Sequence, residues 1–157
     1  VKLCEDLSKG WGVFAAEMIH KGDFVCEYVG ELITQAEADR RVALCPDVDN
    51  YLFCLPTRGA SGKGTAGFSA SVCVIDAYAI RNVAPFINFS CEPNLESRPS
   101  FAASGDARLP RVTFYAKRDI YVGEELGYRR DPSATSSKQR NKTIACRCGA
   151  AVCNKGV

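Results

Sequence analysis

The stretch Phe86-Ile-Asn-Phe-Ser-Cys-Glu-Pro-Asn94 is the longest of six short motifs that follow one another along this 157-residue sequence. No single motif is decisive, but six in this order are very unlikely to arise by chance. A cysteine-rich tail closes the chain, so the patterned sequence extends from about Lys9 to Cys153. The other five motifs are Gly10-Trp-Gly-Val13, Glu27-Tyr-Val-Gly-Glu31, Tyr51-Leu-Phe53, Ile75-Asp76-Ala77 and Gly123-Glu-Glu-Leu126.

Composition indicates an ordinary globular protein. Hydrophobic residues make up 46% and charged residues 24% of the sequence, and the length fits one domain with a short appendage. No apolar run approaches the roughly 18 residues of a membrane span, so we expect no membrane association. The start lacks both an initiator Met and the pattern of a secretory signal. We therefore expect a piece of a longer chain from a reducing compartment.

The formal net charge of +2 does not favour a dedicated nucleic-acid binder. Basic residues nevertheless gather near the C-terminus. A solvated linker is the simpler interpretation, and contact with nucleic acid or another acidic surface is the alternative. The basic residues are Arg129, Arg130, Lys138, Arg140 and Lys142.

Local patterns predict a mostly β fold with few helices. Thr34-Gln-Ala-Glu37 has the spacing of a capping box, so a helix should begin there and end before Pro46. Gly- and Ser-rich residues 57–71 and 97–110 should form loops, and polar residues 131–145 a linker. Strands are predicted over residues 23–29, 51–55, 72–75 and 111–116.

Taken together, the six motifs resemble the SET-domain lysine methyltransferases, and the terminal Cys-x-Cys-x4-Cys resembles their post-SET zinc module. Residues 23–41 and the tail look most like the branch that methylates the histone H3 tail. The resemblance implies a SET fold of small curved sheets. In that fold the segment around Asn88 and the segment after Leu126 pass each other in a knot-like crossing. It also implies a SET domain over residues 1–130, followed by a linker and zinc-binding segment over residues 131–157.

The resemblance implies a site for S-adenosylmethionine and a channel for the target lysine. The glycines around Trp11 would let the backbone approach the cofactor. Tyr28 and Phe53 would build an aromatic channel that accepts the lysine methylenes. Tyr28 and Tyr128 would be catalytic, and a Tyr at position 128 would favour addition of fewer methyl groups. The residues expected to bind the cofactor are Lys9, Gly10, Trp11, Tyr51, Asn88 and Phe89.

Nine cysteines are present. Five of them, Cys4, Cys26, Cys45, Cys54 and Cys73, are scattered and are expected to be small buried hydrophobes. Three more lie within eight residues of the tail, where the Gly149 turn would let the chain double back. They are either ligands of one ion or free thiols, and a zinc site needs a fourth ligand. The only histidine, His20, is remote, and the resemblance implies Cys91 as the fourth ligand. The implied closed, structural zinc site is Cys91, Cys146, Cys148 and Cys153.

Several positions depart from the family pattern. Phe89 stands where the family has His, Pro85 where it has Arg, and Arg81 where it has Gly. Arg129 and Arg130 replace an Asp and a catalytic Tyr, and a guanidinium beside a sulfonium donor is electrostatically unfavourable. Two hypotheses follow. One is an active enzyme on histone H3 or similar tails, located in the nucleus on chromosomes. The other is a catalytically silent module that recruits partners to chromatin.

Overall fold

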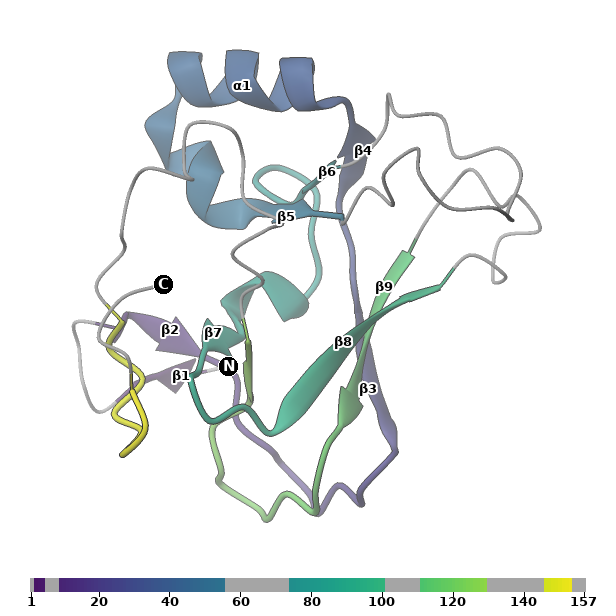
Figure 1. Ribbon diagram of the computed structural model, residues 1–157, viewed down its shortest axis with the longest axis vertical. Coiled ribbons are helices and arrows are strands. Elements are labelled where there is room, and N and C mark those ends of the chain that lie inside the picture. The colour runs from purple at the N-terminus through teal and green to yellow at the C-terminus, as the bar shows by residue number, and fades with distance from the viewer. Residues whose placement is uncertain (1, 5–8, 56–73, 101–110, 130–145, 154–157) are drawn as a thin grey trace.

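The computed structural model describes residues 2–4, 9–55, 74–100, 111–129 and 146–153. These residues form three small sheets and a few short helices, which confirms the predicted mostly β class (Figure 1). The five-stranded sheet has the order β3-β9-β8-β10-β7, and the three-stranded sheet has the order β4-β6-β5. The two-stranded sheet pairs β1 (Lys2–Leu3) with β2 (Trp11–Gly12).

The hydrophobic core lies against the five-stranded sheet. Strand β9 (Arg111–Ala116) runs between β3 (Phe24–Tyr28) and β8 (Leu95–Ser100) and pairs antiparallel with both. Val112, Phe114 and Ala116 alternate along β9 and are fully buried, as expected for a strand with one face on the core. The predicted strands over 23–29 and 111–116 are therefore confirmed.

The loop predicted over residues 97–110 is wrong for its first four residues. Ser97 to Ser100 continue β8 and pair with β9. The sequence hid this strand because Ser97-Arg-Pro-Ser100 is polar and contains a proline. Of the residues in β8, only Leu95 pairs with β10, so beyond Leu95 that side of β8 is an edge of the sheet. Proline has no backbone N–H to donate, and at an edge position such as Pro99 none is needed on that side.

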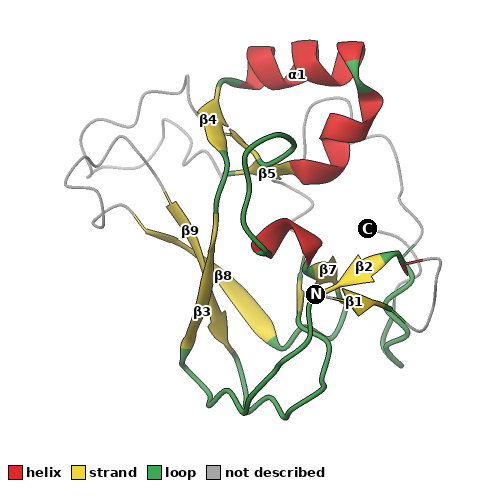
Figure 2. Ribbon diagram, turned by 180° about the vertical axis from the view of Figure 1, so that it is seen from behind, coloured by secondary structure: helices red, strands yellow, loops and turns green. Residues whose placement is uncertain are grey.

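The predicted helix is α1 (Gln35–Leu44), which lies over the three-stranded sheet (Figures 1 and 2). The Thr34 hydroxyl accepts a hydrogen bond from the Glu37 N–H at 3.1 Å, so the predicted N-cap is confirmed. The reciprocal half of the capping box is not formed, because the Glu37 carboxylate accepts from Arg40 and Arg41 instead. Beneath α1 lie β4 (Glu31–Ile33), β5 (Leu52–Cys54) and β6 (Val74–Asp76).

Pro46 ends α1 as predicted and opens the 3-10 helix η2 (Pro46–Tyr51), which leads into β5. A second 3-10 helix, η3 (Ala84–Phe86), leads into β7 (Asn88–Phe89). Both helices therefore deliver the chain directly to one of the six motifs.

The predicted crossing of distant segments is formed by β7 and β10 (Gly127–Tyr128). Strand β10 lies between β7 and β8 and runs parallel to both. Asn94 holds this crossing in place, because its buried side chain donates to the Glu125 carbonyl and accepts from the Gly127 N–H. A segment about forty residues distant in sequence thus lies beside Asn88 and Phe89.

The remaining predictions have mixed outcomes. Cys4 and Cys54 are buried as expected, whereas Cys26 and Cys45 are only partly buried. The loop over 57–71, the linker over 131–145 and Cys73 lie outside the described residues. Within the described part of the chain, no helix is long and apolar enough to cross a membrane.

Candidate functional site

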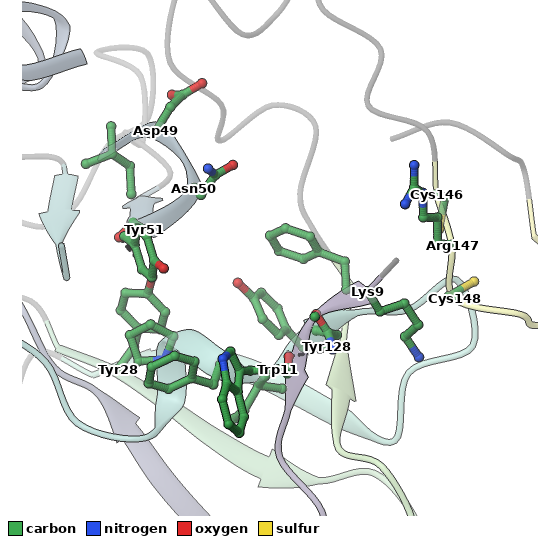
Figure 3. A pocket seen from close by; sticks show the side chains of 17 residues that line it. Lys9, Trp11, Tyr28, Asp49, Asn50, Tyr51, Tyr128, Cys146, Arg147 and Cys148 are labelled. Carbon is green, nitrogen blue, oxygen red and sulfur yellow. Dashed lines mark hydrogen bonds between the residues drawn. The ribbon is translucent and has the colours of Figure 1, made fainter. Parts of the chain in front are cut away.

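A pocket of about 610 Å³ opens where the β2 turn, the end of η2, the η3–β7 segment and the cysteine tail meet (Figure 3). Its volume lies in the range typical of small-ligand sites. The structure brings all six predicted cofactor-binding residues and both predicted catalytic tyrosines to its wall. These residues are Lys9, Gly10, Trp11, Tyr28, Tyr51, Asn88, Phe89 and Tyr128.

One wall of the pocket is the turn before β2. Gly10 has a φ of 72°, a left-handed conformation that glycine adopts without strain. The turn presents Trp11, whose side chain is 54% exposed. Asn88 fastens this turn from the opposite strand, because its side-chain nitrogen donates to the Trp11 carbonyl at 3.1 Å.

Glu125 lies behind this wall and links its parts. Its carboxylate accepts from the Asn88 side chain at 2.8 Å and forms an ion pair with Lys9. Burial alone would raise the pKa of Glu125, but the hydrogen bonds from Lys9 and Asn88 outweigh it and hold that pKa below its ordinary value. Sequence reasoning quoted the Gly-Glu-Glu-Leu motif and missed this role. The signal was a second acidic residue directly before the buried Leu126.

The floor of the pocket is an aromatic cluster. Tyr128 and Tyr28 are both buried, and Tyr128 packs on Phe53 with ring centroids 5.9 Å apart and nearly parallel planes. Phe53 reaches Tyr28 at 5.1 Å. Phe53 itself does not line the cavity, so it supports the floor from beneath. Phe114, which lies outside the six motifs, also packs against Tyr128, with ring centroids 4.9 Å apart.

Four of the five positions that depart from the family pattern lie among the described residues, and three of them, Phe89, Pro85 and Arg129, are near the pocket or the cysteine cluster. Phe89 packs edge-on against Tyr128 at 5.0 Å, and Pro85 lies in the pocket wall. Arg129 is exposed, is not among the pocket-lining residues, and donates to the Cys91 carbonyl at 2.8 Å. Its guanidinium is therefore directed to the segment after β7 that carries Cys91. Arg130 lies outside the described residues.

The four predicted metal ligands converge. The Sγ atoms of Cys91, Cys146, Cys148 and Cys153 all lie within 4.8 Å of one another. Cys91 Sγ is 3.7 Å from Cys146 Sγ and 3.9 Å from Cys153 Sγ. Tetrahedral zinc with Zn–S bonds of about 2.3 Å places its sulfurs about 3.8 Å apart, so both the donor set and its spacing fit zinc.

Local backbone geometry supports this cluster. Gly149 has a φ of 72°, so the predicted turn between ligands is present. Although burial opposes it, hydrogen bonds from the backbone N–H groups of Cys91 and Ala150 lower the pKa of the Cys148 thiol, whereas burial raises the pKa of the neighbouring Cys146 thiol. A low pKa favours the thiolate, which is the metal-binding form. Cys146 and Cys148 also line the large pocket, so the cluster and the pocket share a wall (Figure 3).

The family pattern of the SET domain matches residues 10–129. The chain belongs to the SET domain family. Histone-lysine N-methyltransferase EHMT1 of Homo sapiens is 41% identical over 144 residues, which cover 92% of this chain and 10% of that protein. Histone-lysine N-methyltransferase SUV39H2 of Xenopus tropicalis is 36% identical over 158 positions, covering 94% of this chain and 36% of that protein.

Solved structures agree with this assignment. The crystal structure of KRYPTONITE in complex with mCHG DNA and SAH matches with a TM-score of 0.68 and 33% identity, over 94% of this chain and 27% of that one. The predicted SET fold is therefore confirmed. The chain spans between 10% and 36% of the length of the two curated relatives named above.

Proposed function

We propose that this chain transfers a methyl group from S-adenosylmethionine to a lysine side chain of a protein substrate, the histone H3 tail. The observation that carries the proposal is the convergence of the six cofactor positions and of Tyr28 and Tyr128 on one pocket floored by buried aromatic rings. The names of the relatives support the reaction and the substrate. One relative from Arabidopsis thaliana, 38% identical over 94% of this chain and 21% of its own length, is described as H3 lysine-9 specific SUVH6.

The cofactor supplies an electrophilic methyl group on a sulfonium. The polarity of Asn88 fits a role in holding the cofactor's amino-acid part. Its side-chain nitrogen already donates to Trp11 and Glu125, so its side-chain oxygen is the atom that is left to accept from an ammonium group. Lys9, Gly10, Trp11, Tyr51 and the Phe89 backbone complete the proposed cofactor wall.

The aromatic floor suits a lysine side chain. The rings of Tyr28 and Tyr128, supported by Phe53, provide apolar surface for methylenes and attractive faces for a cationic amine. Exclusion of water from such a floor lowers the pKa of an entering lysine, which favours the neutral, nucleophilic amine. Tyr28 and Tyr128 each bring a buried hydroxyl-bearing ring to this place. We propose that Tyr128 limits the number of methyl groups that are added.

We further propose that Cys91, Cys146, Cys148 and Cys153 hold a structural zinc ion. A closed four-cysteine set leaves no ligand position for catalysis, so the ion would fix the wall formed by Cys146 and Cys148. Residues 1–130 would form the SET domain, and residues 131–157 a linker and post-SET segment. A nuclear, chromosomal location is proposed with the histone substrate.

The proposal is tested in two steps with the same zinc-loaded protein. Calorimetry should detect binding of S-adenosylmethionine, and mass spectrometry should then detect a mass increase of one or more methyl groups on a histone H3 tail peptide. A matched peptide with its lysines replaced by arginine is the control and should gain no mass. Folded protein that binds no cofactor would overturn the proposed chemistry.

The same assay discriminates the silent-module hypothesis. That hypothesis expects a folded, zinc-loaded chain that binds partners without the cofactor. It expects no methyl transfer to the peptide. The double substitution Arg129→Asp with Arg130→Tyr restores the family pattern at both positions. Transfer gained only in this variant would identify a lineage that has lost catalysis, whereas transfer by the unchanged chain supports the proposed enzyme.

A further inference from the structure

We propose that Arg81 is a positioning residue of the cofactor pocket, because its guanidinium braces two aromatic residues that form the pocket wall from distant parts of the chain. This inference rests on the proposed function. Arg81 lies outside the pocket lining and is exposed, so it acts through its neighbours and not by contact with the cofactor.

The geometry of the brace is a double cation–π contact. The central guanidinium carbon of Arg81 lies 4.8 Å from the ring centroid of Tyr51 and 5.4 Å from that of Phe86. Both distances fall within the roughly 6 Å over which such contacts are attractive. Tyr51 ends η2 and Phe86 ends η3, and both line the pocket. One side chain therefore ties together the two 3-10 helices that meet at the pocket.

The backbone that carries Arg81 is anchored. The side chain of the next residue, Asn82, donates to the Glu27 carbonyl at 2.7 Å and accepts from the Ala84 N–H at 3.2 Å. These bonds fasten the segment to β3 on one side and to the start of η3 on the other. Because the backbone at Arg81 is already fixed, only the side chain loses conformational entropy when it orders over the two rings. The entropic cost of the contact is therefore smaller than it would be on a flexible segment.

Tyr51 is the residue that needs such a brace. Its backbone is fixed, because its carbonyl accepts from the Tyr28 hydroxyl at 2.9 Å and from the Ala77 N–H at 3.1 Å. Its ring is only half-buried: besides packing against the hydrophobic core, it contacts Arg81 and lies 5.6 Å from the Tyr78 ring in a T-shaped pair. The backbone bonds do not choose the rotamer of the ring. Arg81 and Tyr78 do.

The shape of the guanidinium matters as well as its charge. A planar guanidinium offers two faces and several edges, and is weakly hydrated, so it can lie against two rings at once. A lysine ammonium is a compact, strongly hydrated point charge. Arg81→Lys should therefore recover only part of the effect that Arg81→Ala removes.

The chain offers a matched control. Arg98 lies over the Tyr115 ring at 4.5 Å, the same kind of contact on the outer part of β8 and β9, and neither residue lines the pocket. Calorimetry of S-adenosylmethionine binding should give a dissociation constant about three- to tenfold higher for Arg81→Ala than for the unchanged chain. Arg98→Ala should bind the cofactor as the unchanged chain does.

Two further readouts separate positioning from general loss of structure. Ring-proton resonances of Tyr51 and Phe86 in cofactor-free protein should shift in Arg81→Ala and stay in place in Arg98→Ala. Steady-state kinetics should show a raised KM for the cofactor, with the KM for the H3 peptide changed by less than about twofold.

The outcomes are distinct. Unchanged cofactor affinity in Arg81→Ala, with a functional unchanged chain, would overturn the role of Arg81 and leave the proposed function intact. A second outcome would also overturn the brace: Arg81→Lys binds the cofactor as tightly as the unchanged chain, while Arg81→Ala binds it more weakly. That result would mean that a positive charge at position 81 is sufficient. An unchanged chain that binds no cofactor would remove the proposed function, while the ring resonances would still report whether the brace exists.

Discussion

The Tyr28 hydroxyl donates a hydrogen bond of 2.9 Å to the backbone carbonyl of Tyr51. This bond joins the end of β3 to the end of η2, two segments that both line the pocket. Since the Tyr51 carbonyl also accepts from the Ala77 N–H, it keeps a partner if Tyr28 loses its hydroxyl. Stability and catalysis can therefore be separated at this residue.

Tyr28→Phe should remove most methyl transfer while lowering the free energy of unfolding by only about 1 kcal/mol, the usual net worth of one hydrogen bond. Transfer to the H3 peptide, followed by mass spectrometry, and thermal unfolding measure the two effects. Tyr121→Phe is the control, because Tyr121 is 61% exposed and lies outside the pocket. Full activity in Tyr28→Phe would remove this hydroxyl from the proposed mechanism.

Asn88→Asp should be more damaging than Asn88→Ala, although it is closer in shape. Both variants lose the donor to Trp11 and Glu125. In the unchanged chain the Asn88 side-chain nitrogen donates to the Glu125 carboxylate at 2.8 Å. An aspartate at position 88 would instead place a second carboxylate beside Glu125, and the two negative charges would repel each other. We expect a loss of about 1–3 kcal/mol in the free energy of unfolding and no measurable cofactor binding for Asn88→Asp. Equal effects of the two substitutions would argue against a charge-sensitive wall.

Metal analysis should find one zinc ion per chain, and Cys153→Ser should lose it. A chelator should lower the unfolding temperature of the unchanged chain by roughly 5 °C or more, because bound metal stabilises only the folded state. Cys45→Ser is the control, since Cys45 lies outside the cluster. Zinc retained in full by Cys153→Ser would disprove the four-cysteine site.

Glu125 should make the protein sensitive to acid. Its pKa in the folded protein is lower than its ordinary value of about 4.3, so its contribution to stability is present above that pH and is lost as the pH falls through the folded-state pKa. Glu125→Gln should lose about 1 kcal/mol of stability near neutral pH and show a flatter decline below about pH 4.5.

Denaturant unfolding between about pH 3 and pH 7 measures this difference. The exposed Glu17 provides the control substitution Glu17→Gln, which should leave the acid profile unchanged. Parallel curves for the unchanged chain and Glu125→Gln would mean that the carboxylate is not held by its neighbours in solution.

Much of this architecture could be predicted from the sequence where a local pattern had a local cause. The Thr34 cap, the stop at Pro46 and the alternation along residues 111–116 each depend on neighbouring residues only. The strand over Ser97 to Ser100 could not be predicted, because it exists through pairing with β9 and its own residues are polar.

The residues of the site also fall into two groups, those indicated by local sequence and those that depend on distant contacts. The pocket-lining residues that were predicted lie in or next to the six motifs. Glu125 and Phe114 act through contacts with residues far along the chain, and a local pattern does not specify those partners. The brace by Arg81 was hidden for the same reason, since its two aromatic partners are set by the meeting of η2 and η3.

The position of β10 between β7 and β8 has a consequence for biosynthesis. The two strands that flank β10, β7 and β8, are complete once Ser100 has left the ribosome, but the position between them stays empty until Tyr128 has emerged. During that interval the nascent chain exposes the apolar surface that Tyr128 later covers. Final closure of the sheet must therefore follow the emergence of Tyr128.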